Sequence, residues 1–436
     1  MRPFGRWKGM AGVVAAVLLA TACGAPAASP QASGQQPSGP PASAPQASTP
    51  PASAVSADLT WQFWIGGTED QAAWEKVAAQ ATADHPGIKV TLQGSAWPDY
   101  WSKIGSQLAS PTGPCIVGMQ SLRHQPFGDA LVPLDDLMAK YGVKAGDFDQ
   151  AILDGLKYKG KQIALPYDTG PMILYYNRDL FTAAGVAEPK PGWTVEDFKT
   201  AATKLTTGGT FGFATASADL NFLAWVLTLN GAQPVENGSL ALTSPAFVDG
   251  YKQYVALMQA NKIAPALTAD SWTQMIEQFS SGKAAMMVEG PWSVISVKGQ
   301  AKFSLGVAPM PAGAAGSKTY TAGSGFGIPQ SCKDQEAAFQ AIVSMTGDKP
   351  LADLGAAGRA YPARPAVQES WYGAAKIEGA RETLEYAAAH SQPIVTSTNW
   401  VQVADLFYRF GVQAMSGELT PEATLQSVQD QAGSGS

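Results

Sequence analysis

The sequence predicts an α/β protein built from two domains. The chain has 436 residues, 45% hydrophobic and 15% charged, which is enough apolar material for more than one core. Its first folded part alternates strand-like and helix-like segments. A later apolar stretch, near residue 165, is interrupted by prolines and a glycine, as expected where a chain leaves one domain for another.

The alternation occupies residues 59–119. Strands are expected at Leu59–Ile65, Ile88–Leu92 and Cys115–Met119, with helices at Thr68–Asp84 and Tyr100–Leu108. This β-α-β-α-β order indicates a mainly parallel sheet covered by helices. Ligands of such sheets bind beyond the carboxyl ends of the strands.

The interrupted stretch is residues 164–177, ALPYDTGPMILYYN. Two apolar strand-like runs flank Pro166–Pro171, a segment with two prolines and a glycine that is not expected within a regular element. We expect a stiff polar bend here, with Tyr167 and Asp168 at the seam between two domains. An ordinary loop is the alternative.

The segments after this seam continue the α/β alternation. A helix is expected at Thr194–Leu205, where Thr194 can cap the first turn together with Asp197. Further helices are expected from Ser244 and over 272–279, 335–345, 405–415 and 420–429. Strands are expected at 211–214, at 320–328 and before Glu289.

The amino terminus predicts a signal peptide over residues 1–22. Basic residues at positions 2, 6 and 8 precede an apolar segment, Ala11–Ala20, that is too short to span a bilayer comfortably. Residues 20–23, ATAC, resemble a bacterial lipobox, although Ala20 replaces the usual leucine. The resemblance implies that Cys23 is lipidated. A plain secretory signal cut near Ala22 is the alternative.

Residues 24–57 contain no charged and no aromatic residue. Their Ala, Pro, Ser, Gln and Gly composition cannot bury enough apolar area to fold, so residues 23–57 are expected to form a lipidated, disordered tether. No later segment is long and apolar enough for a transmembrane helix.

Charge and histidine content argue against several classes of partner. The formal net charge of −6 gives no indication of nucleic-acid binding. The three histidines lie far apart and no metal-binding motif occurs, so neither a metal nor a cofactor is expected.

Several ordered motifs follow the seam. They are Tyr175–Phe181 (YYNRDLF), Ala184-Gly185, Pro189, Trp193-Thr194 and Glu196–Phe198, and then Phe279, Gly282, Lys283, Ala285, Met286, Gly290 and Trp292. Before it, His85–Val90 (HPGIKV) and Gly113–Val117 (GPCIV) fit the same pattern. This order resembles the family-one extracellular solute-binding proteins of ABC importers, the sugar-binding kind similar to maltose-binding protein. The resemblance covers nearly everything after the tether.

The resemblance implies a periplasmic-binding-protein-like type II fold, with a ligand cleft between two α/β lobes. The chain would cross between the lobes three times, near Asp168, Ser317–Thr321 and Arg359–Pro362. Lobe 1 would comprise 58–168 and 320–360, and lobe 2 would comprise 169–319 and 361–436. The protein would be a monomeric, non-catalytic receptor, lipid-anchored on the extracellular face of the bacterial membrane, that delivers a sugar to the transmembrane subunits of a permease.

The resemblance also implies a disulfide. The acidic residue usual before Ile116-Val117 is replaced by Cys115, and Cys332 follows a strand that neighbours this one in the family. We therefore expect Cys115 and Cys332 to be paired, as an exported protein permits.

A sugar needs flat apolar faces for its C–H surfaces and paired polar groups for its hydroxyls. Candidate ligand-binding residues lie at strand ends, in loops and in the family's late motif: Trp64, Trp97, Gln120, Tyr167, Asp168, Asn221, Trp225, Glu289, Gly290, Trp292, Gly323, Ser324 and Arg364. Structural roles compete for several of them. Trp64 and Trp225 could be core residues, Asp168 could brace the hinge, and Glu289 could cap the next turn.

Two other functions stay open at this stage. An exported glycosidase could use Asp168 and Glu289 as paired carboxylates. The same fold could also bind a polyamine or an organic anion, although the aromatic residues and few basic ones at strand ends weigh against an anion.

Overall fold

The computed structural model describes residues 56–66 and 68–433. The predicted signal peptide, Cys23 and nearly all of the predicted tether lie outside these residues. Ala57, expected to be the last tether residue, begins the first strand. Among the described residues, no helix is both long and apolar enough to cross a membrane.

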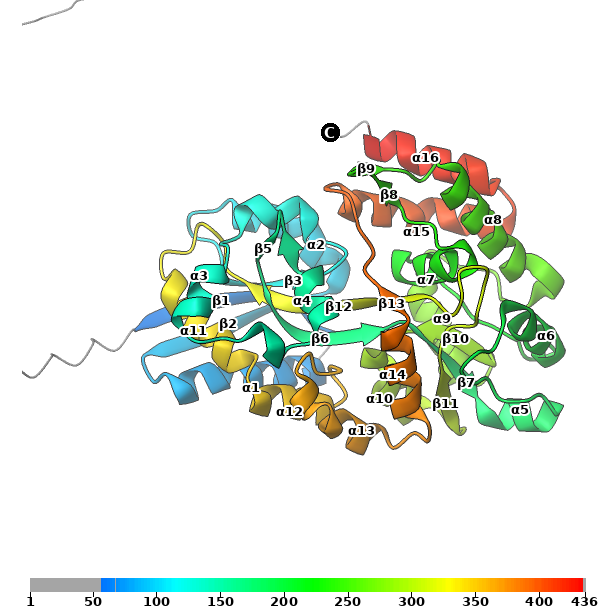
Figure 1. Cartoon of the computed structure of the whole chain (residues 1–436), viewed down its shortest axis with the longest axis horizontal. Helices are drawn as coiled ribbons and strands as arrows, with labels where there is room; N and C mark the ends of the chain where they lie inside the picture. The colour runs from blue at the N-terminus through cyan, green and yellow to red at the C-terminus, as the bar shows by residue number, and fades with distance from the viewer. Residues whose placement is uncertain (1–55, 67, 434–436) are drawn as a thin grey trace, which may run out of the picture. The chain divides into compact units, whose positions relative to one another are not determined.

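The first sheet has six strands in the order β13-β12-β3-β1-β2, with β6 paired to β12 (Figure 1). Its strands are β1 (Ala57–Trp64), β2 (Ile88–Ser95), β3 (Ile116–Gln120), β6 (Leu165–Pro171), β12 (Thr319–Gly327) and β13 (Ser391–Gln392). β1 runs parallel to both β2 and β3, which confirms the predicted parallel arrangement, and β12 is antiparallel to β3.

Helices pack on this sheet to form lobe 1. They are α1 (Thr68–Asp84), α2 (Trp97–Leu108), α3 (Asp135–Lys140), α4 (Gln150–Gly155), α11 (Gln335–Met345) and α12 (Asp348–Ala356). The core between sheet and helices is aromatic. Trp61 and Phe63 of β1 pack against Trp74 of α1 and Phe326 of β12, all buried, with ring centroids 4.7–6.3 Å apart.

The second sheet is antiparallel and has the order β10-β7-β11. Its strands are β7 (Ile173–Asn177), β10 (Met286–Glu289) and β11 (Leu305–Ala308). The helices that form lobe 2 with it are α5 (Arg178–Ala184), α6 (Val195–Leu205), α7 (Asp219–Asn230), α8 (Pro245–Gln259), α9 (Ser271–Ser280), α10 (Val294–Gln300), α13 (Glu369–Ala375), α14 (Ala380–Ala389), α15 (Trp400–Ser416) and α16 (Pro421–Gly433).

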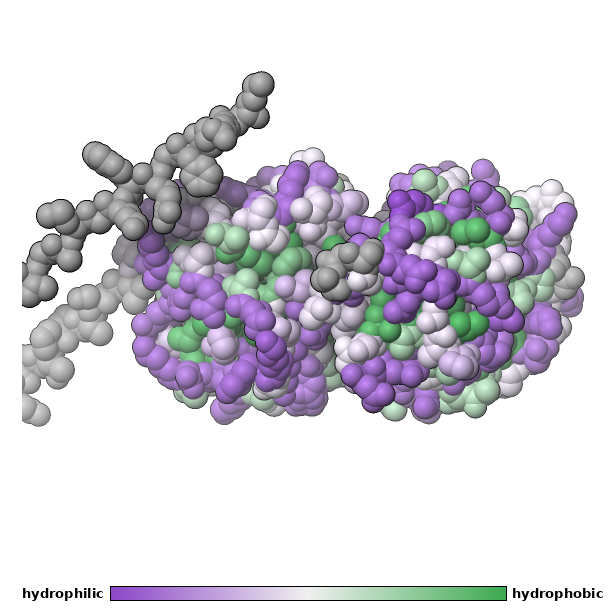
Figure 2. Space-filling model, turned by 90° about the horizontal axis from the view of Figure 1, so that it is seen from above, coloured by the Kyte–Doolittle hydropathy of each residue, from purple (hydrophilic) through white to green (hydrophobic). Residues whose placement is uncertain are grey.

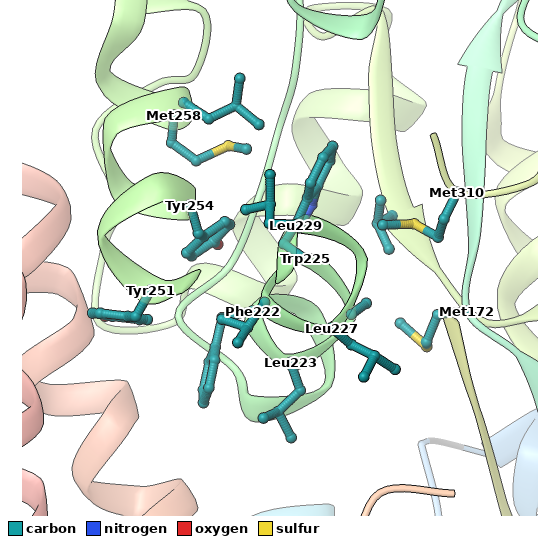
Figure 3. Close-up of a cluster of buried hydrophobic side chains, with 14 of the residues drawn as sticks. Met172, Phe222, Leu223, Trp225, Leu227, Leu229, Tyr251, Tyr254, Met258 and Met310 are labelled. Carbon is teal, nitrogen blue, oxygen red and sulfur yellow. The ribbon is translucent and has the colours of Figure 1, made fainter. Parts of the chain in front are cut away.

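Helix α7 is at the centre of lobe 2. It is buried over nearly its whole length, and Figure 3 shows Phe222, Leu223 and Trp225 pointing into a cluster that α8 completes with Tyr251 and Tyr254. The predicted cap of α6 is present: Thr194 accepts from the Asp197 amide, and Asp197 accepts from the Thr194 amide. On the face shown in Figure 2, hydrophilic residues surround several apolar patches.

Short elements complete the chain. Two small hairpins are β4 (Lys157–Tyr158) with β5 (Lys161–Gln162) and β8 (Val235–Glu236) with β9 (Ser239–Leu240). The 3₁₀ helices are η1 (Gln125–Ala130), η2 (Ala145–Asp147), η3 (Ala260–Lys262), η4 (Pro291–Ser293) and η5 (Pro365–Val367).

The expected bend at Pro166–Pro171 is wrong, because these residues form β6, a strand that leads directly towards β7. Pro166 and Pro171 lie near the ends of the strand. The pairing with β12 also shifts register between Ser324 and Gly325, so Tyr167 has no partner of its own there. Strand ends and bulges are where a ladder tolerates residues without an N–H.

Three chain segments lie side by side at this point. One edge of β6 pairs with β12. On the other edge, the Thr169 amide donates to the Tyr361 carbonyl and the Ala363 amide donates to the Tyr167 carbonyl, each at 3.0 Å. The three stretches expected to cross between lobes therefore form one hydrogen-bonded group.

A disulfide joins Cys115, just before β3, to Cys332, which follows β12, with Cα atoms 4.8 Å apart. The pairing implied by the family resemblance is present. Because β3 and β12 are neighbours in the first sheet, the bond links two segments 217 residues apart in the chain.

Candidate ligand-binding site

A cluster of aromatic rings lies at the carboxyl end of β1. Trp64 and Trp97 are half-buried and meet edge to face with centroids 5.0 Å apart, and Trp101 packs within 5.6 Å of both. Trp97 and Trp101 are one turn apart on α2, which a proline at its first turn helps to start. Trp64 and Trp97 thus keep part of each ring accessible.

Arg123 connects this cluster to lobe 2. It follows β3, and its guanidinium lies 5.1 Å from the ring centre of Trp97. Its Nη2 donates to Oδ1 of Asp219, the first residue of α7, at 2.8 Å, and both side chains are almost fully buried. Trp400 of α15 donates to the other oxygen of Asp219 at 2.8 Å. The Nη1 atom of Arg123 is buried and has no partner among the described residues.

No sequence motif singles out Arg123 or Asp219 as a functional residue. Arg123 lies in SLRHQPF directly after a buried strand, and Asp219 is the first residue of α7, a helix that is buried over nearly its whole length. The available signal for a functional role was that each charged residue lies next to a buried apolar segment. Only the folded structure shows that they meet.

The hinge places Asp168 and Ser324 opposite each other. The Ser324 amide of β12 donates to Oδ1 of Asp168 at 2.6 Å, and both residues are buried. Burial raises the pKa of Asp168 to about 8, and hydrogen bonds from Ser324 offset part of that effect. Gly323 allows this close approach, since a Cβ there would lie 2.5 Å from the Asp168 carbonyl oxygen.

In lobe 2, Glu289 ends β10 with its side chain completely buried. Its Oε2 accepts from Nε1 of Trp272 at 2.8 Å, and its Oε1 accepts from the Gly290 amide at 2.9 Å. Burial raises the pKa of this carboxyl, and hydrogen bonds from Gly290, Trp272 and Trp292 act in the opposite direction. Glu289 therefore helps to fix the orientations of the Trp272 and Trp292 side chains.

The turn after Glu289 packs against the hinge. Pro291 contacts Gly170 of β6 so closely that a Cβ on Gly170 would lie 2.2 Å from the proline ring. Gly290 is overlaid by the Trp292 ring in the same way. Trp292 is half-buried, so part of its indole stays accessible beside the hinge.

The hydroxyl of Tyr408 on α15 is influenced by the charges of these groups. Burial raises the pKa of its hydroxyl, the charges of Asp219 and Glu289 add to the rise, and Arg123 opposes it. The interlobe ion pair and the Glu289 carboxyl thus both act on a single side chain.

Two other predicted ligand-binding residues, Tyr167 and Trp225, lie within hydrophobic cores. Tyr167 is buried among Phe63, Trp74 and Phe326 in the lobe 1 core. Trp225, which Figure 3 labels, is fully buried in lobe 2, and its ring centroid lies 4.7 Å from that of Phe198. Trp225 is thus a core residue, which was the alternative to a ligand-binding role.

Three polar candidates form hydrogen bonds with neighbouring groups of the protein. Asn221 donates to the Val288 carbonyl at 2.8 Å and so fixes α7 to β10. Gln120 accepts from the Leu122 amide at 2.9 Å. Arg364 donates to the Thr346 carbonyl at 2.7 Å and lies over the Phe148 ring. These contacts hold Arg364 against residues of lobe 1.

A surface groove of about 490 Å³ lies between α13 and α14. Its lining includes Glu369, Tyr372 and Arg381, and none of the predicted ligand residues. Among the described residues, no group of three or more His, Cys, Asp or Glu side chains could hold a metal ion.

Comparison with known proteins identifies the family. The family described as bacterial extracellular solute-binding protein matches residues 76–379, more than half of the chain. The chain belongs to this family. It is a solute-binding protein of the extracellular or periplasmic space, and the proteins of this family are binding receptors without enzymatic activity.

Solved structures confirm the α/β periplasmic-binding-protein-like fold. The ABC substrate-binding protein Lmo0181 from Listeria monocytogenes, in complex with cycloalternan, has a TM-score of 0.77 at 21% identity, covering 87% of this chain and 99% of that one. The GacH receptor of Streptomyces glaucescens, solved unliganded and with acarbose, has a TM-score of 0.73 at 25% identity, covering 86% and 97%.

The name of a curated relative contains a ligand different from those of the two solved structures. The sn-glycerol-3-phosphate-binding periplasmic protein UgpB of Brucella abortus is 30% identical over 178 residues, which is 37% of this chain and 39% of the relative.

Proposed function

We propose that this receptor binds a carbohydrate between its two lobes and delivers it to an ABC permease. The observation that carries the proposal is the presence of partly accessible indoles on both lobes, Trp64 and Trp97 on one and Trp292 on the other. Flat apolar rings match the C–H faces of a sugar. Since each ring is fixed by packing or hydrogen bonds, little ordering is required on binding.

Polar groups near these rings suit sugar hydroxyls, which both donate and accept. The unpartnered Nη1 of Arg123 is a donor that lies against Trp97. Asp168 and Ser324 offer a carboxyl and a hydroxyl where β6 pairs with β12. A ligand that contacts both lobes favours the arrangement in which they meet, which couples binding to hinge closure.

The glycosidase alternative has no support at Glu289. This carboxyl is fully buried and both of its oxygens accept hydrogen bonds, so it cannot reach a scissile bond in this arrangement. A phosphate ligand such as that of UgpB would need cationic charge. The charge of Arg123, the buried cation beside the rings, is already paired with Asp219.

A thermal-shift screen of the purified protein tests the proposal. The panel contains glucose, galactose, mannose and xylose, a trisaccharide of each, and sn-glycerol 3-phosphate. At least one carbohydrate is expected to raise the melting temperature, because a ligand that binds the folded state stabilises it. A shift with sn-glycerol 3-phosphate alone, or with no member of the panel, would overturn the carbohydrate proposal.

The membrane attachment is proposed separately. We infer from residues 20–23 that Cys23 carries the lipid and that residues 24–57 tether the receptor to the membrane. In cells, Cys23→Ser should move the protein from the membrane fraction to the soluble exported fraction. A variant that stays in the membrane fraction would contradict the anchor.

A further inference from the structure

Trp272, which no sequence motif singles out, has an exposed indole with a fixed orientation. Among the described residues, two large apolar residues are exposed. Trp272 has 37% and Val395 has 53% of its residue surface accessible to solvent. Val395 lies in a connecting segment, whereas Trp272 lies in the first turn of α9.

The position of Trp272 is set by two anchors. Its Nε1 donates at 2.8 Å to Oε2 of Glu289, a carboxyl with no exposed surface. The preceding residue, Ser271, is buried, and its hydroxyl accepts from the Ser217 amide at 3.0 Å. A buried carboxylate is costly unless it is hydrogen-bonded, so this one strongly favours a single orientation of the exposed ring.

The same carboxyl also ties Trp272 to the proposed ligand site. Gly290 donates its amide to Oε1 of Glu289, and the Trp292 ring lies directly over Gly290. Two indoles on different elements, α9 and η4, are therefore packed around one buried carboxyl. Trp292 is half-buried beside the hinge, while Trp272 is the more exposed of the two.

We propose that Trp272 is a specificity-determining residue that contacts a second sugar ring of the ligand. The inference rests on the proposed carbohydrate function and narrows it to a disaccharide or longer chain. A monosaccharide seated on Trp292 has no second ring to place on Trp272. An oligosaccharide gains a second stacking contact on a surface that is already fixed, so it binds more tightly than its monosaccharide.

Glu289 is a positioning residue in this scheme. It does not contact the ligand and acts by orienting the two indoles. Trp272→Phe keeps a flat ring but removes the N–H that donates to Glu289. This variant therefore tests the orientation of the ring separately from its apolar surface.

Isothermal titration calorimetry tests the inference, with the monosaccharide and trisaccharide pair that gives the largest shift in the thermal screen. The wild type should prefer the trisaccharide. Trp272→Ala should weaken trisaccharide binding about tenfold and leave monosaccharide binding unchanged, while Trp272→Phe should give a smaller loss. Val395→Ala, the matched change at the other exposed apolar side chain, should change neither.

The outcomes separate the two proposals. If the protein binds a carbohydrate but Trp272→Ala binds the trisaccharide as well as the wild type does, the role of Trp272 is overturned and the carbohydrate function stands. A wild type that binds the monosaccharide more tightly also overturns it. If the wild type binds no carbohydrate, the proposed function fails and this inference fails with it. Melting temperatures without ligand confirm that each variant is folded.

Discussion

Arg123 of lobe 1 and Asp219 of lobe 2 form a buried ion pair, with Nη2 and Oδ1 2.8 Å apart. They are 96 residues apart in the chain and are brought together only by the arrangement of the lobes. The 3₁₀ helix η1 also contacts α15, so the ion pair does not bridge the lobes alone. The pair is thus part of a contact between lobes that any hinge opening has to break.

Removing one member of this pair should destabilise the protein strongly. Arg123→Met leaves Asp219 buried with Trp400 as its remaining side-chain partner among the described residues, and losing one partner of a buried pair costs about 3–5 kcal/mol. Urea unfolding should show this loss in the free energy of unfolding. The double variant Arg123→Met/Asp219→Leu should lose less than the sum of the single variants.

An exposed ion pair provides the control for this prediction. Lys103 and Asp99 lie 3.7 Å apart, both more than half exposed, on α2. Lys103→Met should change the free energy of unfolding by less than about 0.5 kcal/mol. Equal effects of Lys103→Met and Arg123→Met would show that burial does not determine the strength of the Arg123–Asp219 pair.

Much of the fold could be predicted from the sequence because hydrophobic period and chain order are local signals. The parallel order of β1, β2 and β3 follows from alternating segments, and the cap of α6 follows from the spacing of Thr194 and Asp197. The strand at 165–171 could not be predicted that way. Its prolines are tolerated only because a register shift and the strand ends place them where the ladder needs no N–H, and this depends on β12.

The candidate site was harder to predict than the fold, because residue type does not report burial. Trp225 and Trp272 are both tryptophans in helical segments, yet one is fully buried and the other is among the most exposed apolar side chains. Glu289 was selected as a ligand contact, whereas the structure places it beneath the rings it orients. Which side of a helix faces the other lobe is decided by packing between segments far apart in the chain.

Trp292→Ala should weaken binding of the best carbohydrate about 10- to 100-fold, because a partly buried aromatic ring beside the hinge carries a large share of the contact energy. Unlike Trp272→Ala, it should affect the monosaccharide and the trisaccharide alike. Titration calorimetry measures both. Trp193→Ala, a half-buried tryptophan that packs 6.1 Å from Phe198, is the matched control and should leave affinity unchanged. Unchanged affinity in Trp292→Ala would remove this residue from the site.

The disulfide between Cys115 and Cys332 should stabilise lobe 1. It closes a loop across 217 residues, and loss of such a bond costs about 3–5 kcal/mol in the chain-entropy description. The double variant Cys115→Ser/Cys332→Ser should unfold at correspondingly lower urea concentration. Dithiothreitol should lower the stability of the wild type but not that of the variant. A wild type whose unfolding midpoint does not respond to complete reduction would contradict this role.

The pH dependence of stability should carry the signature of Asp168. Burial raises its pKa in the folded protein to about 8, above the value of an unfolded aspartate, so folding favours the protonated carboxyl. Its contribution to stability is therefore fully present below pH of about 4 and is lost as the pH rises through about 8. Asp168→Asn mimics the neutral form and keeps an oxygen for the Ser324 amide. Relative to this variant, the wild type should lose on the order of a few kcal/mol between pH 5 and pH 8.5.

Urea unfolding at the two pH values measures that difference. Leu165→Val is the matched control, because it alters another buried residue of β6 without changing a titratable group or a hydrogen bond to one. It is expected to lower stability by the same amount at both pH values, so its curve should run parallel to that of the wild type. If the Asp168→Asn curve is also parallel to the wild type, the carboxyl is ionised in the folded protein at pH 5 and the hinge carries a buried charge. Convergence of the two curves at low pH is the expected result, since there the wild type holds a neutral carboxyl at the same position.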